Sequence, residues 1–311
     1  MFVFRWVANG LAPLTLLGAI AAYLYPPAFL IFKDVFLWLF AATMFALGVV
    51  LDTGELRDTL KHPGRVGVGV LTQFSVMPTL AFAAAWGAGL PPELALGFII
   101  VGCAPGAMAS NVIVYLAGGA VAFSVALTTV ATLLSPILTP ALVEWLGGVF
   151  LPIPFWPMML TILKTVLAPL LLGIALQRVL GKRITAAKAI APGIAAIAIV
   201  IICSYAVASN HQYLSEVGPT VVMLVVLINL AGYALGWVVA SGYGFDRSHR
   251  LTLSIEIGMQ NAGLGVALAL AHFTPLVALP GVLFAVWCIL TAAGASAWLR
   301  RVESRAVQAL P

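Results

Sequence analysis

Charge is scarce in this sequence: Asp, Glu, Lys and Arg together make up 8% of its 311 residues. A soluble domain of this length needs far more charge on its surface, so a soluble globular protein is excluded. The net charge of +5 does not indicate nucleic-acid binding, because the basic residues are spread among short loops rather than gathered in one patch. We therefore expect no nucleic-acid partner.

Cysteine and the common enzyme motifs are also scarce or absent. The three cysteines, Cys103, Cys203 and Cys288, lie in apolar segments, as small core residues do, and not in the spacing of a disulfide framework or metal site. The patterns G-x-x-x-x-G-K-[ST], G-x-S-x-G and H-E-x-x-H are missing, as are paired intramembrane aspartates. ATP-driven and hydrolytic chemistry therefore have no motif to support them, and we do not expect an enzyme.

Apolar residues dominate instead, at 63% of the chain, with a mean hydropathy of +1.12. Apolar runs of roughly 20 residues, enough to cross a bilayer as a helix, recur from end to end. The sequence predicts an all-α polytopic membrane protein with ten transmembrane helices, in contact with the lipid bilayer. The expected spans are 8–25, 35–51, 65–87, 95–117, 121–145, 155–178, 187–207, 218–241, 249–273 and 277–299.

The distribution of Lys and Arg supports ten spans rather than nine. Lys33 faces one side of the membrane and Lys164 falls within span six, while the other thirteen basic residues fall on the opposite side. Because cytoplasmic loops carry the excess of Lys and Arg, both termini are predicted to be cytoplasmic. The thirteen are Arg5, Arg57, Lys61, Arg65, Arg178, Lys182, Arg183, Lys188, Arg247, Arg250, Arg300, Arg301 and Arg305.

An even division gives two halves of five spans, residues 1–150 and 151–311. Five is an odd number, so the halves lie in opposite orientations and form a 5+5 inverted repeat. Spans four and nine then occupy the same position in their halves, and each carries a polar break. Two interrupted hydrophobic segments in corresponding positions are typical of the binding site of a secondary transporter.

The two breaks differ in composition. Pro105 removes a backbone donor and Gly106 weakens the helix, so unwinding is expected around 103–107. The second break lacks proline and is attributed to glycines around a polar Gln-Asn pair. These residues are Gly258, Gly263, Gly265, Gln260 and Asn261.

Glu256 is a lone carboxylate at bilayer depth, where a charge costs several kcal/mol without a partner or a wet cavity. With carbonyls freed at the breaks it suits a hard cation such as sodium, which prefers oxygen ligands. An ion pair with Lys164 is the structural alternative. Amides at the starts of the following half-helices suit an anionic substrate; those residues are Met108, Ala109, Asn261, Ala262 and Gly263.

Further oxygen ligands lie nearby in the sequence: Ser110 and Asn111 follow the first break, Ser124 and Thr128 share a face of span five, and Gln73 lies in span three. The alternatives are that the hydroxyls bond to their own helix and that Gln73 joins helices. Three other polar residues are interpreted as packing groups, namely Asn9, Asn229 and Thr291.

Three segments together resemble the bile acid:sodium symporters and their bacterial relatives over nearly the whole chain. They are Gly102-Cys103-Ala104-Pro105-Gly106 running into Ala109-Ser110-Asn111-Val112, then Ser124-Val125-Ala126-Leu127-Thr128-Thr129, and Glu256-Ile257-Gly258-Met259-Gln260-Asn261. The resemblance implies crossing broken helices four and nine, a panel of spans 1, 2, 6 and 7, and a core of spans 3–5 and 8–10. It also implies a multi-pass protein of a bacterial plasma membrane.

The same resemblance implies two sodium ions and no organic cofactor. One sodium site would comprise Ser110, Asn111, Ser124, Thr128 and Glu256. The other would comprise Gln73, Glu256, Gln260 and the carbonyls of Ile257 and Met259. Glu256 would be shared between the two sites.

The chain departs from its bacterial relatives where substrate is expected. Ala107-Met108 stands where many have Gly-Thr, and Cys288-Ile289 follows Trp287 where many have His-Asn. The expected substrate is an organic anion, either bile-acid-like or a smaller carboxylate such as pantoate or a keto acid. The leading hypothesis is sodium-coupled symport by alternating access. The alternative is cation/proton antiport with Glu256 as proton carrier, and the oligomeric state is not indicated.

Overall fold

The computed structural model describes residues 11–51, 54, 63–214, 218–288 and 290–291. This part of the chain is almost entirely helical and contains no β-strand, which confirms the all-α fold. Several residues used in the sequence argument lie outside the described ranges, namely Arg5, Asn9, Arg57, Lys61, Ile289, Arg300, Arg301 and Arg305.

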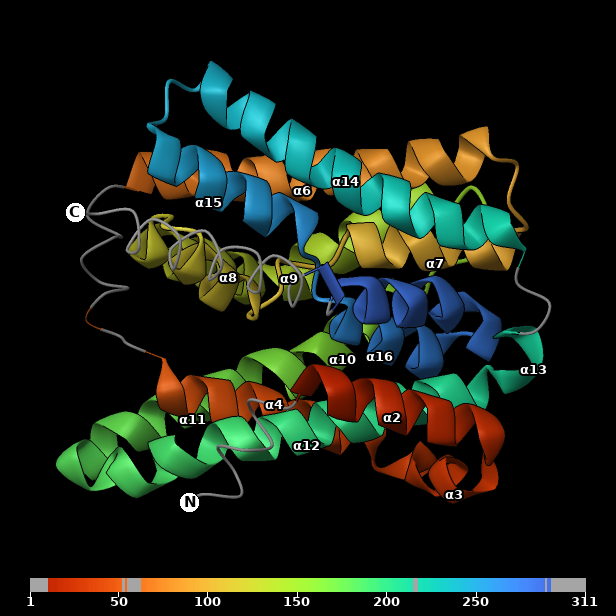
Figure 1. The fold of residues 1–311 in the computed structure, drawn as a ribbon, viewed down its shortest axis with the longest axis horizontal. Coiled ribbons are helices and arrows are strands. Elements are labelled where there is room, and N and C mark those ends of the chain that lie inside the picture. Colours follow the sequence, from red (N-terminus) through yellow and green to blue (C-terminus); the bar gives the residue numbers. More distant parts are fainter. Residues whose placement is uncertain (1–10, 52–53, 55–62, 215–217, 289, 292–311) are drawn as a thin grey trace, which may run out of the picture.

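The helices follow the expected segments closely (Figure 1). The first half contains α2 (Leu11–Leu24), α3 (Pro27–Leu30), α4 (Phe36–Val50), α6 (Pro63–Gly87), α7 (Pro92–Gly102), α8 (Ser110–Leu116) and α9 (Val121–Gly147). The second contains α10 (Phe155–Ile162), α11 (Ala168–Leu180), α12 (Thr185–Ser209), α13 (His211–Leu214), α14 (Pro219–Gly242), α15 (Arg247–Gly258), α16 (Ala262–His272) and a helix over Pro275–Cys288. Short 3₁₀ segments cover Ile31–Asp34 and Gly181–Ile184, and a π-helical turn, Leu163–Leu167, joins α10 to α11.

Five helical stretches in the described residues are long and apolar enough to cross a bilayer: α6, α9, α10 through α11, α12 and α14. Four shorter apolar helices are α4, α7, α16 and Pro275–Cys288. With a rise of 1.5 Å per residue, α7 and α16 each cover only about half of the hydrocarbon thickness. The structure thus shows a polytopic membrane protein with half-length helices around both breaks.

The connection after α2 differs from the loop expected there. Pro13–Leu24 and Pro27–Asp34 are two helices bent by 111° relative to each other. Pro26 and Pro27 explain the bend, because proline ends one helix and is well tolerated in the first turn of the next. The chain therefore turns sharply before α4 begins.

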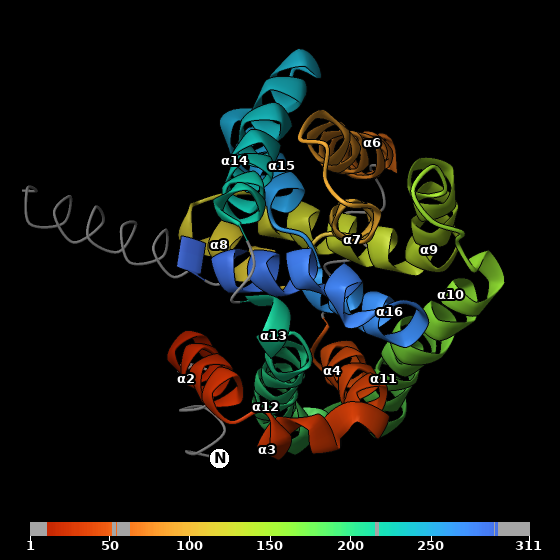
Figure 2. The ribbon, with the colours of Figure 1, turned by 90° about the vertical axis from the view of Figure 1, so that its right-hand side faces the viewer.

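The helices form two groups, which Figures 1 and 2 show from perpendicular directions. In one group α12 packs on α4 and α2, and α11 packs on α4. In the other, α14 packs on α15, while α6 packs on α7, α9 and α14. Helix α16 packs on α7 of this second group and also touches α4 and α12 of the first. The two broken helices therefore sit where the groups meet.

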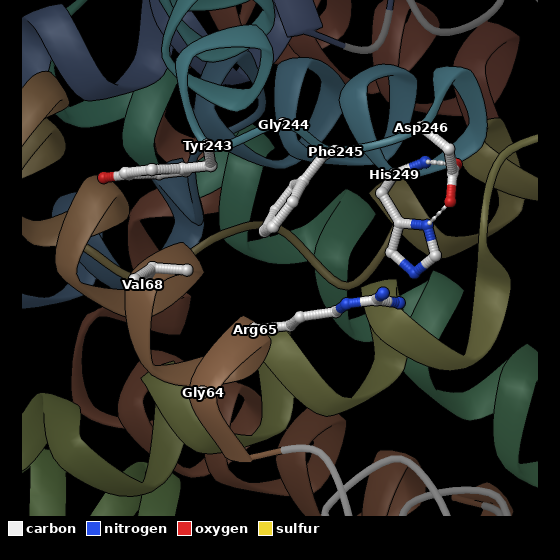
Figure 3. Close-up of a pocket in the computed structure, with 8 residues that line it drawn as sticks. All are labelled: Gly64, Arg65, Val68, Tyr243, Gly244, Phe245, Asp246 and His249. Atoms are coloured by element: carbon white, nitrogen blue, oxygen red, sulfur yellow. Dashed lines mark hydrogen bonds and ion pairs between the residues drawn. The ribbon is translucent and has the colours of Figure 1, made fainter.

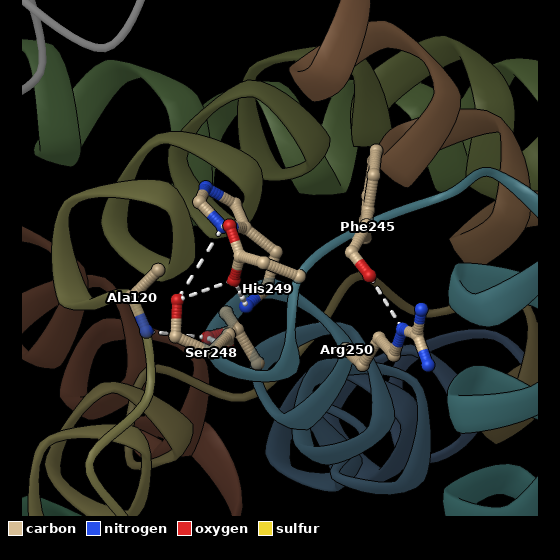
Figure 4. A network of polar contacts seen from close by, with 7 residues as sticks. Ala120, Phe245, Ser248, His249 and Arg250 are labelled. Carbon is tan, nitrogen blue, oxygen red and sulfur yellow. Dashed lines mark hydrogen bonds and ion pairs between the residues drawn. The ribbon is translucent and has the colours of Figure 1, made fainter.

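Helix α15 is anchored at its start by a polar network (Figure 4). Asp246 caps the helix by accepting from the backbone amide of His249 at 3.0 Å, and Ser248 Oγ donates to the same carboxylate at 2.8 Å. These bonds, led by the one from the His249 amide, hold the pKa of Asp246 well below its usual range. The backbone amide of Ala120 donates to Thr252 Oγ1 at 2.8 Å, which ties α15 to the start of α9.

Candidate functional site

The two breaks meet although they lie about 150 residues apart in sequence. Residues 103–109 leave the α-helix between α7 and α8, and residues 259–261 leave it between α15 and α16. Gly106 and Gln260 form an antiparallel bridge. The amide of Ala107 donates to Met259 O at 2.8 Å, and that of Asn261 donates to Pro105 O at 2.8 Å. Each break thus satisfies backbone groups that the other leaves unpaired.

Glycine is required at position 106 because the site lies directly against it. A Cβ atom there would lie 2.8 Å from Glu256 Oε2. Any larger residue would displace the carboxylate or separate the two breaks. The conformation of Gly106 is unexceptional, so close approach explains the glycine.

Glu256 has no solvent exposure and is surrounded by hydroxyl groups. Ser110 Oγ donates to its Oε1 at 2.5 Å, Thr128 Oγ1 donates to its Oε2 at 2.8 Å, and Ser124 Oγ also donates to Oε1. Lys164 is exposed on the π-helical turn, and among the described residues the one ion pair joins His249 to Asp246. The alternative of a Glu256–Lys164 ion pair is therefore wrong.

The hydroxyls around Glu256 have more acceptors than protons. Ser110 Oγ also lies 2.6 Å from Ala107 O, Ser124 Oγ lies 2.6 Å from Asn111 Oδ1, and Thr128 Oγ1 lies 2.8 Å from Ser124 O. Each hydroxyl can donate only once, so three protons serve six acceptor contacts. A bound cation relieves such a surplus of lone pairs, because hard cations take oxygen ligands.

The residues of the second predicted cation site are joined by side-chain amides. Gln73 Nε2 donates to Gln260 Oε1 at 2.8 Å and to Ala104 O at 3.2 Å, and Gln260 Nε2 donates to Ile257 O at 2.8 Å. In the part of the chain that the structure describes, the buried Oε1 of Gln73 has no hydrogen-bond partner. An unpaired buried acceptor is costly and suits a ligand for a cation.

The residues predicted to meet substrate occupy the two half-helix starts. At α8 the amides of Ser110 and Asn111 bond to Ala107 O at 3.0 Å and Met108 O at 3.4 Å, while those of the predicted residues Met108 and Ala109 have no partner among the described residues. At α16, Asn261 caps the helix by accepting from the Leu264 amide at 3.1 Å. Ala262 is buried, whereas Gly263 is partly exposed and its amide has no partner among the described residues. The amides of Asn261 and Ala262 bond to Pro105 O and Gln260 O at 2.8 Å, so each half-helix start combines bonded and free donors.

A cavity of about 600 Å³ lies elsewhere, where the start of α6 meets the turn between α14 and α15 (Figure 3). Arg65, Tyr243, Phe245 and His249 are among its lining residues. None of the predicted site residues lines it. The cavity is therefore separate from the crossing of the two breaks.

The structure adds two polar residues that the sequence argument did not place at the breaks. Thr139 Oγ1 of α9 donates to Cys103 O at 2.8 Å, and Asn229 Nδ2 of α14 donates to Gly258 O at 2.8 Å. Asn229 had been interpreted as a packing residue. Its position three residues before Gly232-x-x-x-Gly236, a spacing typical of close helix contact in membranes, is the clue available from sequence.

Comparison with known proteins gives a consistent result. The profile of the Sodium Bile acid symporter family matches residues 37–217. The uncharacterized sodium-dependent transporter YocS of Bacillus subtilis is 36% identical over 288 residues, covering 92% of this chain and 90% of the relative. The probable sodium/metabolite cotransporter BASS1 of Arabidopsis thaliana, a chloroplast protein, is 37% identical over 239 residues. That match covers 76% of this chain, which spans 60% of the plant protein's length.

Proposed function

This chain belongs to the sodium bile acid symporter family, and from that premise we propose that it carries an organic anion across the membrane together with sodium. Its relatives are named as sodium-dependent transporters and cotransporters rather than enzymes. Sodium-coupled transport is thus the general activity of the family. The cation sites, the substrate and the topology below are proposals.

The observation that carries the proposal is the environment of Glu256. A fully buried carboxylate faces three hydroxyls and no cationic side chain among the described residues. The surplus of acceptor oxygens in this cluster matches what a sodium ion needs and would be costly for a structural hydrogen-bond network.

We assign the first cation site to this cluster and the second to the group around the unpaired Gln73 Oε1. The first comprises Ser110, Asn111, Ser124, Thr128 and Glu256; the second comprises Gln73, Glu256, Gln260 and the carbonyls of Ile257 and Met259. The first site joins α8 to α15, and the second joins the second break to Gln73, which also donates to Ala104 O of the first break. Their joint occupation would therefore hold α7–α8 and α15–α16 in register.

We place the anionic substrate at the start of α16, beside the free amide of Gly263 and the capping residue Asn261. The positive end of the helix favours a carboxylate there. Met108 and Ala109 precede α8 at the same crossing, and their amides also have no partner among the described residues. A smaller carboxylate, such as a pantoate-like hydroxy acid or a keto acid, fits the departures at Ala107-Met108 and Cys288-Ile289 at least as well as a bile acid.

The proposed topology has ten spans in a 5+5 inverted repeat of residues 1–150 and 151–311. The packing of α2, α4, α11 and α12 on one another, and of α6, α7, α9, α14 and α15 on one another, supports a panel and a core, with α10 on α9 and α16 where the two meet. The excess of Lys and Arg on one side supports cytoplasmic termini, and the Bacillus relative supports a bacterial plasma membrane. Alternating access would then be movement of the core against the panel.

The test is uptake of a panel of labelled organic anions into proteoliposomes under an imposed sodium gradient. We expect sodium-driven uptake of at least one carboxylate, and its loss in Glu256→Gln. Glu144→Gln is the matched control, because Glu144 is exposed and belongs to neither proposed site. If a pH gradient without sodium drives the flux instead, the antiport alternative is favoured and symport is wrong.

A further inference from the structure

Asn229 lies on α14 at a point where α14 and α15 touch through their backbones. A Cβ atom on Gly232 would lie 3.1 Å from the Cα atom of Gly258, and one on Gly236 would lie 2.8 Å from the Cα atom of Ser254. The two glycines thus admit α15 to the surface of α14. Asn229, one turn away from Gly232 and fully buried, is brought beside the second break.

The hydrogen bonds of Asn229 fix which way its amide faces. The indole Nε1 of Trp287, which can only donate, bonds to Asn229 Oδ1 at 2.9 Å. The Asn229 Nδ2 group therefore faces the other way and donates to Gly258 O at 2.8 Å, with Cys288 Sγ 3.9 Å away. Trp287 thus orients Asn229, and Asn229 in turn holds a backbone carbonyl.

The carbonyl that Asn229 holds is at the end of a helix. Gly258 is the last residue of α15, and Met259 after it is extended, with φ −102° and ψ 98°. A carbonyl at a helix C-terminus has lost its intrahelical donor, and inside a membrane it finds no water. The amide of Asn229 supplies the missing donor. The second break contains no proline to end the helix at that point. The bond from Asn229 stabilises the helix end instead.

The first break has a matching partner on the equivalent helix. Gln73 of α6 donates from its side-chain amide to Ala104 O at 3.2 Å, as Asn229 of α14 does to Gly258 O. Helices α6 and α14 are the third spans of the two proposed halves. The difference lies in the acceptor oxygens: Oε1 of Gln73 has no partner among the described residues, whereas Oδ1 of Asn229 is occupied by Trp287. The side chain of Gln73 can therefore bind a cation through Oε1, whereas that of Asn229 positions the backbone carbonyl to which it donates.

We propose that Asn229, oriented by Trp287, is a positioning residue that holds the second break open and thereby places the carbonyls of Ile257 and Met259, which flank Gly258, at the second cation site. The inference rests on the proposed function. Asn229 acts through the backbone and does not itself bind sodium.

The test is thermal unfolding of the purified protein with sodium chloride titrated against potassium chloride at constant ionic strength. Asn229→Ala should raise the sodium concentration for half-maximal stabilisation about tenfold or more, as losses of groups that orient metal ligands do. Trp287→Phe keeps an aromatic side chain, although a smaller one, and removes the indole donor, so we expect a smaller rise of about fivefold. Half-saturation is the decisive readout, because a purely structural role would lower the unfolding temperature in sodium and in potassium alike and leave the half-saturating sodium concentration unchanged.

Asn210→Ala is the matched control: it also loses a buried amide, whose Nδ2 bonds, among the described residues, to Ala206 O in the last turn of α12, at 3.0 Å. Its half-saturating sodium concentration should equal that of the wild type. If the half-saturating sodium concentration is unchanged in both Asn229→Ala and Trp287→Phe, the inference about Asn229 is wrong while the proposed function still stands. If Asn229→Ala does not fold, the result for Trp287→Phe decides. Absence of any sodium response in the wild type would overturn the proposed function, and the inference with it.

Discussion

Thr128 and Thr129 are adjacent buried threonines on α9 with opposite surroundings, and they offer a matched pair of substitutions. Thr128 Oγ1 lies 2.8 Å from Glu256 Oε2, whereas Thr129 Oγ1 has no partner among the described residues. Valine is nearly isosteric with threonine, so Thr128→Val and Thr129→Val each delete one buried hydroxyl. Only the first is expected to weaken sodium binding.

The size of the effect follows from the kind of bond removed. A hydrogen bond to a charged group contributes about 1.5–3 kcal/mol, so Thr128→Val should weaken sodium binding by at least about tenfold. At a sodium concentration one hundred times the wild-type dissociation constant, ligand binding stabilises the wild type by about 2.7 kcal/mol. The same concentration would stabilise a variant with tenfold weaker binding by only about 1.4 kcal/mol.

The assay is chemical or thermal unfolding in matched sodium and potassium buffers, with sodium-driven uptake as a second readout. Thr129→Val should keep the full sodium response and should be at least as stable in potassium, because it removes an unpaired buried hydroxyl. The reasoning fails if Thr128→Val responds to sodium like the wild type, or if Thr129→Val loses as much of the response.

Three further outcomes are expected. Gly106→Ala should abolish sodium-driven uptake, since its Cβ would lie 2.8 Å from Glu256 Oε2; normal uptake by this variant would contradict the close approach. Gln73→Leu should reduce sodium affinity in the same unfolding assay while sparing folding, because it also removes the unpaired Oε1; unchanged affinity would remove Gln73 from the second site. The pKa of Asp246 is lowered chiefly by the His249 amide, so its charge stabilises the fold above the unfolded-state value of about 3.9 and this contribution is lost as the pH falls through the lower folded value. Asp246→Ala should therefore lower the unfolding temperature most near neutral pH, and a deficit that grows towards acid pH would contradict the sign.

The first break could be predicted from sequence because its cause is local. Pro105 lacks an amide proton and Gly106 is a weak helix former, and the chain leaves the helix at 103–109, slightly further than the expected 103–107. The second break is predicted at the correct place, but not all of the glycines to which the sequence argument attributes it cause it. Gly263 and Gly265 lie within α16, and a Cβ on Gly265 would lie 3.0 Å from Val101 Cγ2, so Gly265 serves the packing against α7.

The partners of the polar residues could not be read from spacing alone. Ser124 and Thr128 share a helical face, but whether they bond to their own helix or to another group depends on what lies opposite. The structure places both kinds of acceptor within reach of Thr128, since its hydroxyl lies 2.8 Å from Ser124 O and 2.8 Å from Glu256 Oε2. Asn229 presents the same difficulty: the Gly232-x-x-x-Gly236 spacing indicates a close helix contact nearby, but it does not identify Gly258 O or Trp287 Nε1, which belong to different helices.

The central claim, that Glu256 and the hydroxyls around it form a sodium site, is tested most directly by sodium-dependent stabilisation of the purified wild type and of Glu256→Gln. The substitution keeps the shape of the side chain and removes its charge. We predict stabilisation of the wild type by sodium and not by potassium, and loss of that difference in Glu256→Gln. Equal sodium-specific stabilisation of both proteins would contradict the assignment.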